Sequence, residues 1–141
     1  MAKFNRTGLD RLEILKGLAE VVGADARVFA AYLFGSLARD EGGPMSDIDV
    51  AICLKDDGDA EEHRLALLLE ISRRLGVDEV DLVVLNRAPV TLQASVIRDG
   101  VVFLDRDPFA RYAFESLALR KFFDFSIKER DIFRRRFGVG G

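Results

Sequence analysis

One stretch, LFGSLARDEGGPMSDIDVAICL at 33–54, constrains this chain more than any other part of the sequence. An apolar run ends at Gly35-Ser36, and ten residues then separate Ser36 from Asp47 and Asp49, which open a second apolar run. Side chains alternate across a strand, so both aspartates are expected on one face. Two carboxylates one step apart repel each other, and this disfavours their burial unless a cation lies between them.

A third carboxylate, Asp81, lies inside a later apolar run, EVDLVVL. If that strand pairs with the strand of Asp47 and Asp49, three carboxylates converge. Hard oxygen ligands suit Mg²⁺, with Mn²⁺ as an alternative. The sequence therefore predicts a metal site formed by Asp47, Asp49 and Asp81, with one or two ions, as is typical of phosphoryl or nucleotidyl transfer.

Gly35-Ser36 is the candidate phosphate-binding turn. Glycine allows the backbone to approach a ligand closely, and Ser36 is a favourable N-cap for a short helix predicted at 37–39. The first N–H groups of such a helix and the Ser36 hydroxyl would bind the phosphates of a nucleoside triphosphate. Arg39 is a candidate either for holding a phosphate or for anchoring the loop to a nearby acid.

Each of these features also has an ordinary structural interpretation. A lone Gly-Ser pair is typical of a simple turn, and a lone Asp-x-Asp pair is typical of a solvated strand edge or a loop cap. An acid inside a strand, such as Asp81, could pair with a nearby arginine. Their order along the chain and their apolar flanks together favour a functional site.

Length, charge and cysteine content set further bounds. At 141 residues the chain is expected to form a single domain, 1–141, with its own core. The net charge of −3 gives no overall basic field, so direct nucleic-acid binding is not expected. Cys53 is the only cysteine, which excludes an internal disulfide, and it is expected to be buried. Neither a membrane-spanning segment nor a signal peptide is visible, so we expect a cytoplasmic protein without membrane contact.

Hydrophobic periodicity predicts an α/β fold. Helices are predicted at 9–22, 61–75, 89–98 and 108–137, and strands at 27–34, 47–54, 79–85 and 101–104. The long connection between the second and third strands includes a helix and permits a parallel crossover, which would place Asp81 beside Asp47 and Asp49. His63, the only histidine, lies in the first turn of a predicted helix and is expected at the surface.

The C-terminal segment 106–137 differs from the preceding core, 9–105. Eight of the eleven phenylalanines lie between Phe103 and Phe137. Residues 106–136 have nine basic against five acidic residues, whereas residues 1–105 have twelve against nineteen. A helix packed on the domain, a partner-binding surface and a nucleic-acid contact are the three interpretations. Aromatic residues interleaved with arginine are favoured at interface cores, so we expect a helical partner-binding surface.

The pattern of Gly35-Ser36, Asp47-x-Asp49 and a later strand aspartate, Asp81, resembles the DNA-polymerase-β-like nucleotidyltransferase superfamily. The resemblance implies a small mixed sheet flanked by helices. The short chain is similar to the minimal nucleotidyltransferases (MNT proteins). The segments GSLARDEGGPMSDIDVAI and DPFARYAFESLALRKFFDF resemble those of MNT antitoxins encoded with HEPN-domain toxins. The resemblance covers about 9–137.

This resemblance implies an enzyme, an ATP-dependent protein adenylyltransferase that uses Mg²⁺. Its implied acceptor is a tyrosine hydroxyl of a cognate HEPN toxin, an RNase that AMP would block. One alternative is an antitoxin that neutralises the toxin by stoichiometric binding without catalysis. Another is a nucleotidyltransferase acting on a small molecule or an RNA end, which the short chain and the negative charge disfavour.

Overall fold

The computed structural model describes residues 10–39 and 47–138. In chain order its elements are α1 (Arg11–Gly23), β1 (Val28–Phe34), β2 (Ile48–Leu54), α2 (Ala60–Leu75), β3 (Val80–Val84), the 3₁₀ turn η1 (Leu85–Arg87), α3 (Val90–Asp99), β4 (Val101–Asp105) and α4 (Pro108–Phe137). The predicted α/β fold with a long C-terminal helix is confirmed, and most boundaries agree to within two residues.

The four strands form one mixed sheet in the order β3-β2-β1-β4. β1 pairs antiparallel with both β2 and β4, and β2 pairs parallel with β3. The parallel pair is joined through α2, which is the crossover that the long connection permits. As a result, the two acid-bearing strands are direct neighbours near one end of the sheet order.

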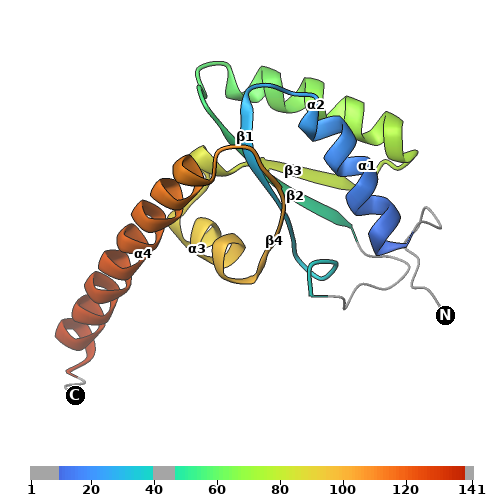
Figure 1. The fold of residues 1–141 in the computed structure, drawn as a ribbon. Helices are drawn as coiled ribbons and strands as arrows, with labels where there is room; N and C mark the ends of the chain where they lie inside the picture. The colour runs from blue at the N-terminus through green and yellow to red at the C-terminus, as the bar shows by residue number, and fades with distance from the viewer. Residues whose placement is uncertain (1–9, 40–46, 139–141) are drawn as a thin grey trace.

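Helices cover both faces of the sheet (Figure 1). α1 and α2 bury their apolar stripes on one face, against alternate residues of β2 such as Ile48, Val50 and Ile52. α3 and the first turns of α4 cover the other face, where β2 presents the small residues Ala51 and Cys53. Cys53 is a free, buried thiol, as expected. Because Asp49 alternates with Ile48 and Val50, its side chain lies on the α3 and α4 face.

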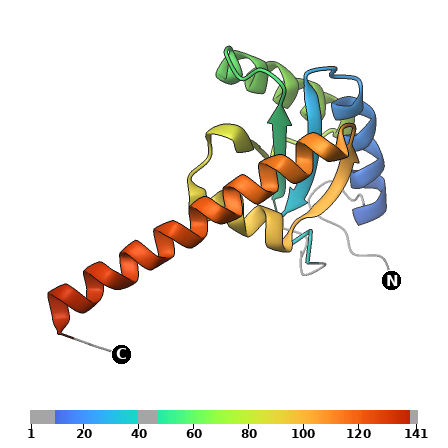
Figure 2. The ribbon, with the colours of Figure 1, turned by 60° about the vertical axis from the view of Figure 1, so that its left-hand side comes forward.

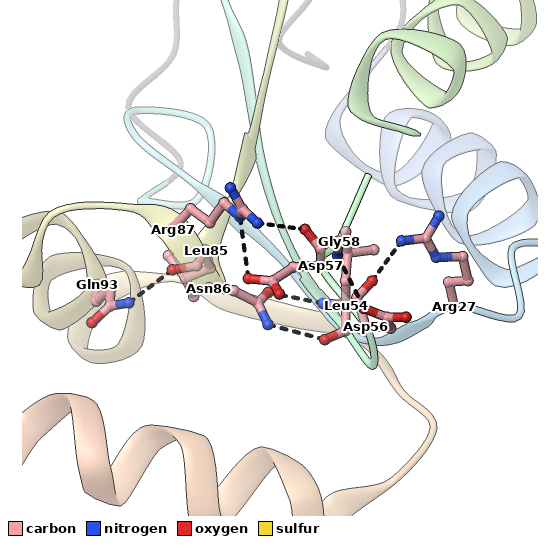
Figure 3. A network of polar contacts seen from close by, with 9 residues as sticks. All are labelled: Arg27, Leu54, Asp56, Asp57, Gly58, Leu85, Asn86, Arg87 and Gln93. Atoms are coloured by element: carbon pink, nitrogen blue, oxygen red, sulfur yellow. Dashed lines mark hydrogen bonds and ion pairs between the residues drawn. The ribbon is translucent and has the colours of Figure 1, made fainter. Parts of the chain in front are cut away.

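Side-chain amides fix the end of the sheet away from Asp49 (Figure 3). The Leu54 N–H donates to Asn86 Oδ1 at 2.9 Å, and Asn86 Nδ2 donates to the Leu54 carbonyl at 2.9 Å. Buried Gln93 donates to the Leu85 carbonyl at 2.8 Å. These bonds extend the β2–β3 pairing beyond the last paired residues and hold η1 and α3 in place, which stabilises the register of the two strands.

His63 is half-buried, which corrects the expectation of a surface position. Its side chain is 19% exposed, and its Nε2 lies 2.5 Å from Asp25 Oδ2. Its Nδ1 lies 3.2 Å from a guanidinium nitrogen of Arg27. Both partners come from the α1–β1 turn and the start of β1, so His63 joins α2 to that turn and has no part in the site around Asp49.

The base of α4 is fastened to the sheet by buried polar contacts. Tyr32 Oη donates to Glu115 Oε2 at 2.6 Å. Arg111 forms ion pairs with Glu115 at 3.1 Å and with Asp105 at 3.0 Å, and the Arg111 side chain is only 13% exposed. Ala118 is the last fully buried residue of the helix.

The distal half of α4 extends away from the domain (Figures 1 and 2). Its large apolar side chains are between 42% and 62% exposed, namely Phe123, Phe125, Ile127, Ile132, Phe133 and Phe137. Exposed apolar side chains in this number on one helix are typical of a protein-binding surface. Among the residues that the structure describes, none of the helices combines the length and hydrophobicity needed to cross a bilayer.

Candidate active site

Asp49 and Asp81 face each other across the parallel pair of strands. In the β2–β3 register, Asp49 is the direct partner of Asp81. Asp47 immediately precedes β2 and is exposed. The expectation that the Asp81 strand lies beside the strand of Asp47 and Asp49 is therefore confirmed.

The three carboxylates act on each other electrostatically. The pKa of Asp49 is raised to about 6, first because the side chain is partly buried and then because Asp81 and Asp47 are both negative. A carboxylate that resists ionisation beside two others is a site that favours a cation.

The donor set fits a hard divalent cation, because carboxylate oxygens are the ligands that Mg²⁺ and Mn²⁺ prefer. Within residues 10–39 and 47–138, however, no three His, Cys, Asp or Glu side chains are gathered closely enough to hold a metal ion. The tight three-carboxylate cluster expected from the sequence is thus a register pair, Asp49 and Asp81, with Asp47 at its margin.

Gly35 lies in contact with Asp49. It directly follows β1, whose last residue, Phe34, pairs with Asp49, and its φ of +75° is in the left-handed region. A Cβ atom at Gly35 would overlap Asp49 Oδ2 and lie 3.1 Å from Cγ. The backbone conformation and the close approach of the carboxylate both require glycine here. The Gly-Ser turn and the carboxylates are therefore one site.

The segment after Gly35 is a turn, not the short helix predicted at 37–39. Residues 36–39 have turn geometry, Ser36 is half-buried and Leu37 is buried in the core. Burial of Leu37 draws the chain back to the domain, which ends the segment before a helix can form. Any phosphate would therefore meet the amides of a turn instead of a helix N-terminus.

A residue that sequence reasoning missed, Arg11, holds this turn. From the first residue of α1, its Nε donates to the Leu37 carbonyl at 2.9 Å and its Nη2 donates to the Ala38 carbonyl at 3.2 Å. The planar guanidinium can satisfy two successive carbonyls at once, which an ammonium group cannot do in the same way. No local pattern identifies Arg11, because its partners are 26 and 27 residues away. Arg39 lies exposed at the end of the same turn.

Comparison with known families and structures agrees with this geometry. The family model described as "Polymerase beta, Nucleotidyltransferase" matches residues 16–109, a span that includes every candidate site residue. Comparison with curated protein sequences gives no match.

Three solved structures are similar in fold. One is a tri-AMPylated Shewanella oneidensis HEPN toxin in complex with MNT antitoxin, at 20% identity over 89% of this chain and 97% of that chain, with a TM-score of 0.67. Another is a toxin–antitoxin with AMP-PNP, at 24% identity over 90% and 98%, with a TM-score of 0.69. A putative minimal nucleotidyltransferase matches at 27% identity over 66% and 95%, with a TM-score of 0.56.

Proposed function

The chain belongs to the polymerase β nucleotidyltransferase family, and we propose that it transfers AMP from ATP to a tyrosine hydroxyl of a cognate HEPN toxin. The observation that supports this most is the pairing of Asp49 with Asp81 beside the Gly35 turn. A phosphate-binding turn in contact with paired carboxylates is what transfer of a phosphoryl or nucleotidyl group requires.

Each part of the site has a role in this proposal. The amides of the Gly35-Ser36 turn bind the β- and γ-phosphates of ATP, and Arg39 adds a positive charge at the end of the turn. Asp47, Asp49 and Asp81 would hold Mg²⁺ or Mn²⁺. When bound, such an ion supplies positive charge for the phosphate oxygens and for the attacking and leaving oxygens.

The chemistry is a displacement at the α-phosphorus. The acceptor hydroxyl oxygen forms a bond to that phosphorus, the bond to the bridging oxygen of the β-phosphate breaks, and pyrophosphate leaves. The hydroxyl proton goes to Asp81, whose side chain is exposed. Residues near the reacting atoms therefore bind, orient and accept a proton, and none needs to form a covalent intermediate.

The similar structures support the proposed partner and a transfer of AMP to it. One similar structure contains a tri-AMPylated HEPN toxin with an MNT antitoxin, and another is a toxin–antitoxin with AMP-PNP. The projecting distal half of α4 supports a protein partner, because its exposed phenylalanines need a surface to bury them. We therefore assign toxin docking to 106–137 and catalysis to 9–105.

Stoichiometric binding without transfer is the second candidate function. The exposed apolar side chains of α4 favour it equally, since docking alone could cover the toxin. The two functions differ in their need for the carboxylates: transfer requires them and masking does not.

Intact mass of the purified toxin decides between them. After incubation with this protein, ATP and Mg²⁺, we expect the toxin to gain one or more AMP units. An Asp47→Asn/Asp49→Asn variant should give no gain, whereas Asp78→Asn, which changes an exposed carboxylate outside the site, should act like wild type. A silenced toxin of unchanged mass in a stable complex with wild type would establish masking instead.

Replacing Arg11 with alanine tests the turn that binds ATP. Loss of both hydrogen bonds should raise the KM for ATP about tenfold, because the turn is then no longer held in its position for binding phosphate. The kcat should fall much less, because the carboxylates stay in place. Arg11→Lys should recover part of the affinity, since it can restore one bond. If both variants lose stability while the KM for ATP is unchanged, Arg11 supports the fold alone.

A further inference from the structure

The parts of the site form a line across the sheet. Phe34, just before Gly35, pairs with Asp49 on β2, and Asp49 pairs with Asp81 on β3. The order from β1 outwards is therefore the Gly-Ser turn, the first carboxylates and then Asp81. β3 is the edge strand of the sheet.

This order fixes the direction of attack in the proposed function. In phosphoryl and nucleotidyl transfer the attacking and leaving oxygens lie roughly in line on opposite sides of the phosphorus. The β- and γ-phosphates lie at the turn after β1, so pyrophosphate leaves on the β1 side. The acceptor hydroxyl must then arrive from the β3 side, past Asp81.

A cavity lies on that side. It has a volume of about 390 Å³ and is bounded by α2, β3, η1 and the start of α3. Its lining residues are mostly apolar: Ala60, Glu61, Arg64, Leu82, Val83, Val84, Arg87, Ala88, Pro89 and Leu92. Leu82 and Val83 directly follow Asp81 and form the end of the cavity nearest to the carboxylates, whereas the residues from η1 and α3 lie towards the end of the sheet away from Asp49. Val83 follows Asp81 by two residues and so shares its face of the strand. The size falls within the range of about 300–1,000 Å³ that is usual for ligand pockets.

We propose that this cavity at the edge of β3 receives the aromatic side chain of the acceptor tyrosine of the partner protein, and so presents its hydroxyl to Asp81. The inference rests on the proposed function and adds the place where its protein substrate is bound. An apolar lining suits a phenol ring, whose only polar atom is the hydroxyl that reacts.

Two arginines decide what kind of group can enter. Arg64 donates to the Leu82 carbonyl at 3.2 Å, so an outward-facing carbonyl of the edge strand already has a partner. Arg64 is held in turn by an ion pair with Glu61 at 2.7 Å. Arg87, at the other side, is anchored to Asp57. A strand of the partner therefore cannot pair along β3 without displacing Arg64, whereas a single side chain can enter between the two arginines.

The test fills the cavity from the strand. Val83→Phe places a ring where the acceptor ring would lie, at a half-buried strand position that tolerates aromatic residues. We expect the KM for the toxin to rise at least tenfold, or about 1.4 kcal/mol, while the Kd for a non-hydrolysable ATP analogue stays within about twofold of wild type. Leu69→Phe on the exposed side of α2 is the control and should change neither.

Each outcome decides the inference. An unchanged KM for the toxin, with wild type active, overturns it and leaves the proposed function standing. A raised Kd for the ATP analogue with an unchanged KM for the toxin also overturns the inference, because the cavity then binds the nucleoside. If wild type transfers no AMP, the proposed function fails and takes this inference with it. Should Val83→Phe not fold, Leu92→Phe fills the same cavity from α3, and the same measurements apply to it.

Discussion

An Asp49→Asn variant is expected to lose nucleotidyl transfer by about a thousandfold or more and still to be more stable than wild type at pH 7. The loss follows from removing a charged oxygen ligand, since stabilisation of the phosphates by a bound cation contributes several kcal/mol and each 1.36 kcal/mol is a factor of about ten. The gain in stability is expected because burial and the negative charges of Asp81 and Asp47 make it costly to keep Asp49 ionised.

The pKa of Asp49 is about 6 in the folded protein, against an ordinary value of 3.8 for an aspartate. Between these values the folded state binds more protons than the unfolded state, so Asp49 lowers the free energy of unfolding as the pH rises from about 4 to 6. Above pH 6 the reduction in the free energy of unfolding caused by ionised Asp49 is complete. Because the side chain is only partly buried, solvent screening reduces this cost to about 1 kcal/mol.

Urea unfolding of both proteins in EDTA, at pH 4 and at pH 7, measures the effect. The variant should be more stable than wild type by about 1 kcal/mol at pH 7, and the difference should shrink towards zero at pH 4. Asp78→Asn should show neither the gain nor the loss of activity. A variant that is less stable at pH 7 would contradict the repulsion among the three carboxylates, whatever its activity.

A Phe123→Asp/Phe133→Asp variant is expected to lose affinity for the toxin by about a thousandfold or more while keeping the stability and ATP affinity of wild type. The two side chains are 62% and 51% exposed and lie on the projecting half of α4, so the domain does not need them. At a docked interface each change would bury a charge in place of an aromatic ring, at a cost of about 2 kcal/mol or more per site.

Lys121→Ala/Lys128→Ala is the control for this variant. It changes the net charge by the same amount, and the spacing of seven places both lysines on one side of the same helix. Affinity measured by calorimetry should stay within about tenfold of wild type for the lysine variant. If the phenylalanine variant binds normally, the toxin docks on another surface and α4 has a different partner.

The sequence predicted most of what depends on local pattern. Alternation in EVDLVVL and in the run after Asp47 identified both acid-bearing strands, and the length of the connection permitted the parallel pairing that the structure shows. The turn at 36–39 was predicted as a helix because Ser36 has the right chemistry for a cap, but burial of Leu37 and the hydrogen bonds from Arg11 decide its shape. These are long-range contacts that no window of sequence contains.

Contacts between residues far apart in the sequence also explain the other differences between prediction and structure. His63 is half-buried because Asp25 and Arg27, more than 35 residues earlier, enclose its ring. The base of α4 packs and its distal half projects, although both halves contain phenylalanine and arginine residues. The two halves of α4 differ because the sheet and the helices on it do not extend beneath the distal half. How far they extend is a property of the assembled fold and cannot be read from the sequence of α4. The roles of Gly35, Ser36, Arg39, Asp47, Asp49 and Asp81 in transfer stay predictions.

The length of α4 has a consequence for how the acceptor is selected. A helix of 30 residues is about 45 Å long, and its base is locked to β1 and β4 by Arg111, Glu115 and Tyr32. The helix therefore holds each residue of its distal half at a fixed distance from the sheet. A partner docked on the distal half is tethered, so a hydroxyl at the matching distance meets the site at high effective concentration, and hydroxyls at other distances do not. Under the proposed function, distance along the partner then acts together with the cavity at the edge of β3 in selecting the acceptor.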